Sequence, residues 1–363
     1  MSPLKTILLD EIAANGPMSL AAYMQRALAD PQYGYYMQRR PFGTAAADGG
    51  DFITAPEVSQ MFGELLGAWL ADLWQRMGQP TAFCLAELGP GRGTLMADIL
   101  RAATVLPGFA EAAEIHFIET SPALRELQKQ AVPQAQFHDS LADLPPLPCL
   151  LVGNEFFDAL PIHQYKKTAA GWTEVMVDRQ GDGLVYADGA SSAAPFSDTL
   201  TAVCPPELAD GSIVESCPTG ETAMTQLSNH IARHGGAALL IDYGHAKPGS
   251  GDSFQALTHH KYVDPLDAPG LADLTAHVNF PLLAHIAAQA GLSIAPITEQ
   301  GAFLENLGLS LRALALMQAS PGREKQINAE RLRLAAPQEI GSLFKVLGVA
   351  HKDMPPMAGF NYD

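Results

Sequence analysis

Cysteine is scarce in this sequence, and the few cysteines stand far apart. The chain of 363 residues has four of them, Cys84, Cys149, Cys204 and Cys217, and no two form a Cys-x-x-Cys pair. Disulfide frameworks and zinc sites need cysteines in closely spaced or matched sets. The sequence therefore predicts buried free thiols in a reducing compartment and excludes a small disulfide-linked scaffold.

Positive charge is scarce as well. Lysine and arginine number 22 against 39 aspartates and glutamates, which gives a formal net charge of -17 at pH 7. The densest basic stretches are the pairs Arg39-Arg40 and Lys166-Lys167. Such a surface repels phosphate backbones and neither pair makes a basic patch, so general binding of nucleic acid is disfavoured and none is expected. An acidic protein suits a cationic ligand or a basic peptide instead.

Long hydrophobic runs are absent too. No stretch approaches the roughly 18 apolar residues that a membrane span requires. The start, MSPLKTILLDEIAANGPMSL, carries Asp10 and Glu11 and has no long apolar core, so it predicts neither a signal peptide nor a transit peptide. We therefore expect a cytoplasmic protein without a membrane span.

Apolar residues are nevertheless abundant, at 47% of the chain, so a large core is expected. Their spacing predicts a mainly helical region over about the first eighty residues. After it, strands and helices alternate, which is typical of an open α/β sheet. We expect buried strands within 83–88, 115–119, 135–138, 148–161, 237–244, 293–300 and 341–351.

The same patterns predict how the chain is organised. We expect an N-terminal helical region over residues 1–80 that includes a lid-like loop, and a core over residues 81–363. Alternating residues with a Gln-Gly-Asp-Gly turn predict an inserted β-hairpin at about 163–188, and helical periods predict helices over about 303–336. The hairpin offers a contact surface for a partner or for a second copy, so a homodimer is one expectation.

The stretch ELGPGRGTL places bare backbone between a strand and a helix. Gly89, Gly91 and Gly93 let a ligand approach the main chain, and the helix start offers unpaired N–H groups. Dinucleotide sites have the pattern Gly-x-Gly-x-x-Gly, whereas Thr94 stands here in place of the third glycine. Glu87 would repel a pyrophosphate but attract an ammonium or a sulfonium. The motif resembles the cofactor turn of S-adenosylmethionine-dependent methyltransferases, and NAD is the weaker alternative.

Acids at the ends of the next two strands fit a nucleoside. Glu119 follows the second strand, where a carboxylate can accept hydrogen bonds from ribose hydroxyls. Asp139 follows the third strand and suits the adenine amino group, and the backbone of Ser140 and Leu141 suits the ring nitrogens. Taken singly, each of these residues also fits an ordinary turn or a solvated acid. Their order along the chain favours the nucleoside.

The stretch NEFFDALP follows the fourth strand, at the edge where open α/β sheets bind ligands. Asn154 lies beside the cofactor in this arrangement, and Phe156 supplies an apolar wall. Glu155 and Asp158 can hold a planar guanidinium with paired hydrogen bonds and offset its charge during methyl transfer. The alternative is that Glu155 caps a helix and Asp158 is exposed.

Two further groups of residues have weaker patterns. In GGDFITAPEVSQMFGE, Thr54 and Glu57 could close over the cofactor and substrate as a lid, or merely begin a helix. His277 lies where a loop begins a helix and is assigned to the substrate side, although a structural histidine is the simpler interpretation. His230 and His234 lie one helical turn apart without acidic partners at zinc spacing, so no metal site is predicted.

Six blocks occur here in the order of a known family: GDFITAPEVSQMFGELLG, ELGPGRGTLMADIL, NEFFDALP, DLTAHVNF, EQGAFLENLGL and SLFKVLG. On these blocks the chain resembles the MidA-like methyltransferases, whose mitochondrial members assist the assembly of respiratory complex I. The resemblance covers nearly the whole chain. One departure is visible, because Asn279 stands where the family has an acid.

The resemblance implies a class I methyltransferase fold, with a Rossmann-like sheet of seven strands whose last strand is antiparallel. It also implies S-adenosylmethionine as cofactor, S-adenosylhomocysteine as product, and symmetric ω-N dimethylation of arginine in a complex I-type subunit. Eukaryotic relatives act in the mitochondrial matrix, and this chain would be a cytoplasmic, bacterial member. Alternatives are a methyltransferase for a small molecule or another side chain, and a non-catalytic cofactor-binding assembly factor.

Overall fold

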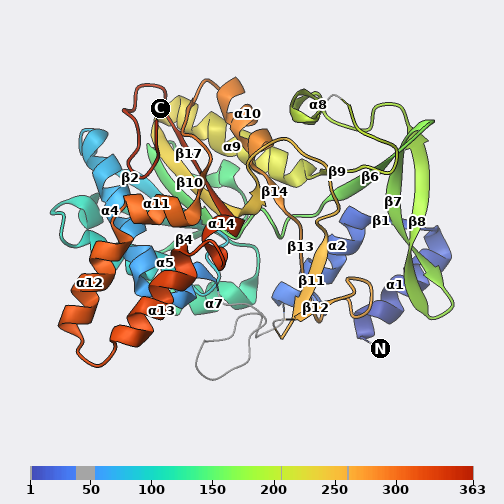
Figure 1. Cartoon of the computed structure of the whole chain (residues 1–363), viewed down its shortest axis with the longest axis horizontal. Coiled ribbons are helices and arrows are strands. Elements are labelled where there is room, and N and C mark those ends of the chain that lie inside the picture. Colours follow the sequence, from blue (N-terminus) through green and yellow to red (C-terminus); the bar gives the residue numbers. More distant parts are fainter. Residues whose placement is uncertain (1, 38–53, 206, 260, 363) are drawn as a thin grey trace.

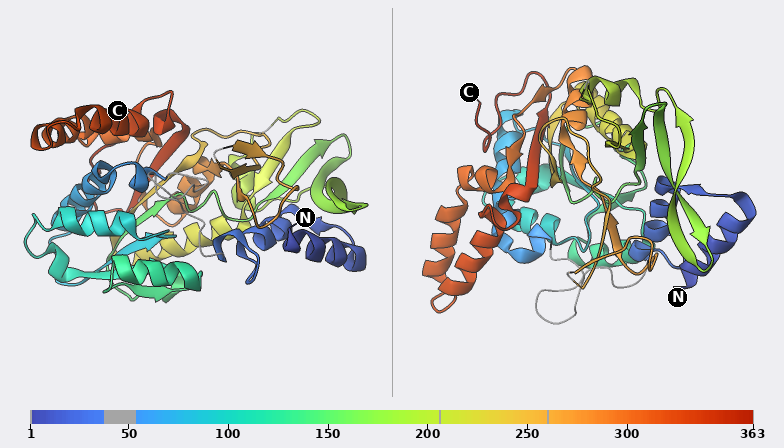
Figure 2. Two further views of the ribbon diagram at one scale, coloured as in Figure 1. Left: turned by 90° about the horizontal axis from the view of Figure 1, so that it is seen from below. Right: turned by 45° about the vertical axis from the view of Figure 1, so that its right-hand side comes forward.

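The computed structural model describes residues 2–37, 54–205, 207–259 and 261–362. A large α/β unit carries a smaller β-rich unit at one side, and the N-terminal helices lie with the smaller unit (Figure 1). Helices α12 and α13 lie at the opposite end of the molecule, as both views in Figure 2 show. None of the helices in the described ranges is long and apolar enough to cross a bilayer.

The α/β fold class is confirmed, and the central sheet contains nine strands among the described residues. Seven follow one another in the order β15-β17-β10-β5-β2-β3-β4, and the last along the chain, β17, runs antiparallel to β10. The bounds along this path are β15 Ser293–Ile294, β17 Phe344–Ala350, β10 Gly236–His245, β5 Cys149–Asn154, β2 Phe83–Leu88, β3 Ala113–Ile118 and β4 Gln136–His138.

The strand count differs from the seven expected because the predicted strand over 293–300 is interrupted. It forms two short strands, β15 and β16 (Thr298–Glu299), which both pair with β17. A further short strand, β14 (Val278–Asn279), pairs with the end of β10. Pro296 lies between β15 and β16, and proline cannot donate a ladder hydrogen bond.

Helices cover both faces of this sheet. Along the central strands, successive side chains alternate between two buried clusters: Leu85 and Phe117 belong to one, and Ala86 and Ile118 to the other. The first face carries α4 Gln60–Arg76, α5 Thr94–Ala103, α6 Phe109–Ala112, α11 Gln300–Asn306, α12 Leu309–Ala319 and α13 Glu324–Ala335. The second carries α8 Asp198–Val203, α9 Pro218–His234 and α10 Phe280–Gln289. Short elements complete the core: α3 Ala55–Val58, α7 Pro122–Ala131, η2 Leu141–Asp143 and α14 Ile340–Leu343.

The smaller unit is built from segments far apart in the sequence. Its five-stranded sheet comprises β1 Met18–Ser19, β6 His163–Thr168, β7 Gly171–Gln180, β8 Gly183–Ser192 and β9 Ile213–Ser216. A three-stranded sheet comprises β11 Gln255–Thr258, β12 Lys261–Val263 and β13 Asp273–Thr275. Helices α1 (Pro3–Asn15) and α2 (Leu20–Ala29) share one hydrophobic cluster with both sheets. The N-terminal helices are therefore held by insertions of the core, and the division of the chain at residue 80 stays a prediction.

Candidate functional site

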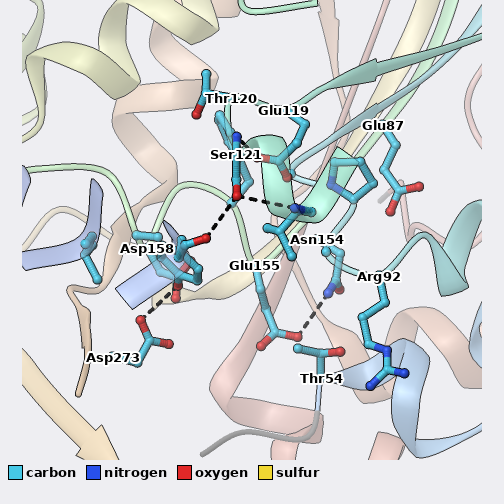
Figure 3. Close-up of a pocket in the computed structure, with 18 of the residues that line it drawn as sticks. Thr54, Glu87, Arg92, Glu119, Thr120, Ser121, Asn154, Glu155, Asp158 and Asp273 are labelled. Atoms are coloured by element: carbon cyan, nitrogen blue, oxygen red, sulfur yellow. Dashed lines mark hydrogen bonds between the residues drawn. The ribbon is translucent and has the colours of Figure 1, made fainter. Parts of the chain in front are cut away.

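A cavity of about 370 Å³ opens at the carboxyl ends of the central strands β2, β3 and β5 (Figure 3). Its other wall comes from α2 and the short helix η1 (Tyr35–Met37) of the N-terminal segment. Among the described residues, its lining includes six acids, Glu57, Glu87, Glu119, Glu155, Asp158 and Asp273, and one basic residue, Arg92. The cavity thus lies where open α/β sheets bind ligands, and its charge suits a cation.

The glycine turn forms the floor of this cavity. Gly89, Gly91 and Gly93 have φ values of 55°, 55° and 83°, in the left-handed region that only glycine adopts easily. Gly89 and Gly91 line the cavity, and Gly93 lies at the N-cap of α5 outside it. A Cβ atom at Gly89 would stand 3.0 Å from Cδ2 of Phe156. Bare backbone is therefore required both by conformation and by space.

We expect Gly89→Ala to weaken cofactor binding more than it lowers stability. The added methyl group meets Phe156 at the cavity wall and strains a positive φ, at a cost of roughly 1–2 kcal/mol for the backbone alone. Gly78→Ala is the matched control, since Gly78 has φ 83° and a Cβ atom there would meet nothing within 4 Å. Thermal unfolding and calorimetry with S-adenosylhomocysteine measure both effects. Equal affinity in the two variants would contradict the assignment of the turn.

Glu87 lies at the end of β2 and is almost fully buried, with 3% of its surface exposed. Burial raises the pKa of its carboxyl group to about 8, and a backbone hydrogen bond from Met96 opposes the rise. Its Oε2 atom has no hydrogen-bond partner among the described residues. A buried acceptor without a partner is costly, which indicates a ligand with a donor or a positive charge.

Glu119 directly follows β3, as the ribose position requires. Its Oε1 accepts a hydrogen bond from the backbone N–H of Ser121 at 2.7 Å, and its Oε2 accepts one from Nε2 of Gln128 at 3.1 Å. Gln128 also donates to the carbonyl oxygen of Gly91 at 2.9 Å. Burial raises the pKa of Glu119, and these donors oppose the rise. The acid is therefore held rigidly against the glycine turn.

The residues assigned to adenine lie outside the cavity. Asp139 is largely exposed, and its Oδ1 accepts a hydrogen bond at 2.6 Å from Arg125, which also donates to the carbonyl oxygen of Glu119. Ser140 accepts a hydrogen bond from Ala142 N–H and thereby caps η2, and Leu141 is buried in the core. None of the three lines the cavity, so their contact with a cofactor stays a prediction.

The turn after β5 has an unusual backbone. Glu155 has φ 51° although it is not glycine, and its N–H donates to the carbonyl oxygen of Ile241 at 2.9 Å. Its Oε1 accepts hydrogen bonds from Asn154 Nδ2 at 3.0 Å and from the N–H of Ala55 at 3.4 Å. No helix in the described part of the chain begins at Glu155, but Ala55 is the first residue of α3, so the carboxylate of Glu155 caps a helix that lies about 100 residues earlier. Backbone strain of this kind clusters at functional sites.

Asp158 is buried, with 5% of its surface exposed, in contrast to the alternative of an exposed acid. Its Oδ2 accepts a hydrogen bond from the phenol of Tyr243, and its Oδ1 has no partner among the described residues. Burial raises the pKa of Asp158 to about 6, and burial together with the charge of Asp158 raises that of Glu155 to about 7. The structure thus brings two poised carboxyl groups together at the cavity.

The scaffold behind this turn was missed by sequence reasoning. Asp242 in β10 is buried, and its Oδ2 accepts hydrogen bonds from the N–H groups of Phe157 and Asp158 at 3.0 and 3.2 Å. Its Oδ1 accepts one from the N–H of Tyr243 at 2.9 Å. The only sequence pattern that could have pointed to Asp242 is its position near the end of the expected buried strand over 237–244, directly before Tyr243. This acid fixes the position of the turn rather than contacting a ligand.

The expected lid residues divide between two places. Thr54 and Glu57 both line the cavity. Thr54 lies at the N-cap of α3, and Glu57 accepts a hydrogen bond from Thr94 Oγ1 at 2.7 Å. The first residues of the stretch GGDFITAPEVSQMFGE, 49–53, lie outside the described residues. His277 instead lines a separate cavity of about 60 Å³. Asn279 also lines that cavity, and its Oδ1 accepts from Leu282 N–H and caps α10, a role that an acid could also fill.

The residues present fit S-adenosylmethionine. The bare turn gives the backbone access that a nucleoside needs, and Glu119 supplies acceptors for ribose hydroxyls. Glu87 Oε2 and Asn154 Oδ1, which have no hydrogen-bond partner within the described part of the chain, supply acceptors for an ammonium group, and Arg92 supplies a cation for a carboxylate. No group of histidine, cysteine and acidic side chains in the described ranges could hold a metal ion.

Comparison with known proteins agrees with this geometry. Residues 65–298 match the family described as S-adenosyl-L-methionine-dependent methyltransferase. The chain belongs to this family. The methyltransferase is also 37% identical over 392 residues to the Drosophila melanogaster protein arginine methyltransferase NDUFAF7 homolog, mitochondrial, covering 97% of this chain and 87% of that one. The human protein arginine methyltransferase NDUFAF7, mitochondrial, is 37% identical over 378 residues, covering 95% and 82%.

A solved structure confirms the cofactor class. The methyltransferase resembles a protein from Burkholderia thailandensis solved with bound S-adenosyl-homocysteine, with a TM-score of 0.84 and 27% sequence identity. The match covers 98% of this chain and 93% of that one. The enzyme class, the S-adenosylmethionine cofactor and the class I methyltransferase fold predicted from the sequence are thereby confirmed, and the eukaryotic relatives are mitochondrial, as expected.

Proposed function

We propose that this methyltransferase transfers methyl groups to arginine side chains of a protein substrate. The observation that carries the proposal is a pair of carboxyl groups with raised pKa at the cavity beside Asn154, the half-buried Glu155 and the buried Asp158. Guanidinium stays protonated at every physiological pH and binds carboxylates through a planar fork. The names of the relatives as protein arginine methyltransferases support the same acceptor.

The two halves of the cavity divide the work. S-adenosylmethionine supplies a methyl group on a sulfonium and leaves as a neutral thioether. Gly89 and Gly91 leave their backbone open to the cofactor, and Glu119 holds its ribose. Asn154 and Glu155 lie between Glu87 and Arg92 on one side and Asp158 on the other (Figure 3), and we assign the side of Asp158 to the substrate. Holding donor and acceptor in line supplies most of the rate in such a transfer.

The carboxyl groups also account for the proton. The methyl group replaces one hydrogen on a terminal nitrogen, so one proton leaves for each methyl added, and the guanidinium keeps its charge. Glu155 and Asp158, with pKa values raised to about 7 and about 6, are suited to accept that proton near neutral pH. Two carboxyl groups at one cavity can each accept hydrogen bonds from a different terminal nitrogen of the guanidinium, which supports symmetric dimethylation.

The family resemblance suggests a complex I-type subunit as the protein substrate, and we propose one. From the sequence we also propose a cytoplasmic location for this chain and a homodimer through the region 163–188. The excess of acids over bases in the chain supports a basic or arginine-containing segment as the partner.

A peptide library tests the proposed acceptor. The purified enzyme is incubated with S-adenosylmethionine bearing a labelled methyl group and with peptides that each carry one arginine. A matched library has lysine at that position, and free arginine and agmatine represent small guanidines. Mass spectrometry is expected to place the label on terminal nitrogens of peptide arginine. Label on lysine or on a small guanidine alone would assign another acceptor, and binding without turnover would favour an assembly factor.

A further inference from the structure

Asp273 reaches the cavity from the smaller unit, far along the chain from the turn after β5. It begins β13 of the three-stranded sheet, is 8% exposed and lines the cavity. The phenol of Tyr36, in η1, donates a hydrogen bond to its Oδ1 at 2.8 Å. The backbone carbonyl of Tyr36 accepts a hydrogen bond from Ser121 Oγ at 3.0 Å, next to the ribose acid. Tyr36 therefore connects the cofactor side of the cavity with Asp273.

Asp273 and Asp158 have the same local chemistry. Each accepts a hydrogen bond from a tyrosine phenol, Tyr36 in one case and Tyr243 in the other. The charges of both aspartates contribute to raising the pKa of both phenols, so the two carboxylates lie within electrostatic reach of the same groups. Figure 3 shows Asp158 and Asp273 at one end of the cavity and Glu87 and Arg92 at the other.

A phenol donor favours the charged form of the carboxylate that accepts its hydrogen bond. The buried Asp158 lines this end of the cavity, and its Oδ1 has no partner among the described residues. The lining of the cavity also includes the apolar side chains of Leu28, Met37 and Leu160. A long side chain with an aliphatic stem and a cationic tip matches this combination of walls and acceptors.

We propose that Asp273, positioned by Tyr36, binds the substrate guanidinium opposite Asp158 and makes the enzyme select arginine over lysine. The assignment rests on the proposed function, since it names the residue that would recognise the arginine side chain. A guanidinium has five N–H donors spread over a plane and can serve several carboxylates at once. A lysine ammonium is compact, so it leaves part of the buried acid set unpaired, and that is costly.

Substitution at Asp273 tests this assignment. We expect Asp273→Asn to raise KM for an arginine peptide roughly 10- to 100-fold, because one charged hydrogen-bond acceptor is lost. The change in kcat should be smaller, and affinity for S-adenosylhomocysteine by calorimetry should stay within about twofold. The relative rate on the matched lysine peptide should rise. Tyr36→Phe should shift KM in the same direction by a smaller factor, since the phenol only positions Asp273.

Asp188→Asn is the matched control, because Asp188 is an acid of the same smaller unit, on β8, outside the cavity. An unchanged KM and unchanged discrimination in Asp273→Asn would overturn the assignment while leaving arginine methylation intact. A wild-type enzyme that labels no arginine peptide would overturn the proposed function, and this assignment with it. If Asp273→Asn fails to bind S-adenosylhomocysteine or to unfold cooperatively, Tyr36→Phe decides, and an unchanged KM there overturns the assignment.

Discussion

Glu155→Gln is expected to lower kcat on an arginine peptide on the order of 10²- to 10³-fold, the range for removing one preorganised electrostatic group from an active site. The amide keeps an oxygen that can accept from Asn154 Nδ2 and Ala55 N–H, so the strained turn should persist. It loses the negative charge that faces the guanidinium and the group that can accept the departing proton. Single-turnover kinetics with labelled S-adenosylmethionine measure the effect.

The pH profile separates a chemical role for Glu155 from a structural one. A carboxyl group holds a cation only when it is deprotonated, so the wild-type rate should rise with pH through about 7, the pKa to which burial and Asp158 raise Glu155. In Glu155→Gln that rise should disappear, leaving a weaker dependence near the pKa of about 6 for Asp158. Glu174→Gln is the control, because Glu174 is an acid of the smaller unit whose Oε1 lies 2.7 Å from Nδ1 of His163. Lost affinity for S-adenosylhomocysteine in Glu155→Gln would assign Glu155 to the cofactor instead.

The local parts of this site could be predicted from the sequence because local chemistry dictates them. Three glycines between a β-strand pattern and a helix pattern predict an exposed backbone turn, and the structure has β2, that turn and α5 in this order. Glu119 follows the second strand of the motif, and parallel strands bring their carboxyl ends to one edge. Asn154, Glu155 and Asp158 line the cavity by the same rule. Short-range patterns were enough for each.

The long-range parts could not be predicted because they depend on which segments meet in space. Asp242 supports a turn some 85 residues earlier, since β10 pairs with β5. Tyr36 and Asp273 are separated by 237 residues and meet only because α2 and β13 share a hydrophobic core. Nothing in the spacing of either residue indicates this pairing. Burial and a hydrogen-bond partner were needed to recognise them.

Two predicted site residues, His277 and Asp139, do not line the main cavity, which shows how far position in a sequence motif can locate a side chain. His277 lies between β13 and β14, a few residues before α10 begins, but it lines the smaller cavity beside Asn279. Asp139 follows the third strand, yet its carboxylate pairs with Arg125, an interaction that no strand pattern encodes. A strand end locates a residue to within one turn of the backbone. The direction of its side chain is decided by the partners that the fold supplies.

Glu119→Gln is expected to weaken binding of S-adenosylhomocysteine roughly 10- to 100-fold, the loss for one charged hydrogen bond to a ribose hydroxyl. Glutamine retains one acceptor for Ser121 N–H or Gln128 Nε2, so the fold should suffer less than it would from alanine. Glu126→Gln is the matched control, because Glu126 is an exposed acid on α7 that pairs with Lys129. Calorimetry measures each affinity.

A modified ligand shows whether Glu119 contacts the sugar itself. The wild type should bind S-adenosylhomocysteine more tightly than its 2′-deoxy analogue, because the analogue leaves a buried acceptor on Glu119 without a partner. Glu119→Gln should lose most of this preference, and the four affinities form a double-mutant cycle whose coupling energy belongs to the hydroxyl–carboxylate contact. If the wild type and Glu119→Gln prefer S-adenosylhomocysteine over the 2′-deoxy analogue equally, Glu119 acts only by holding Gln128 and the glycine turn in place.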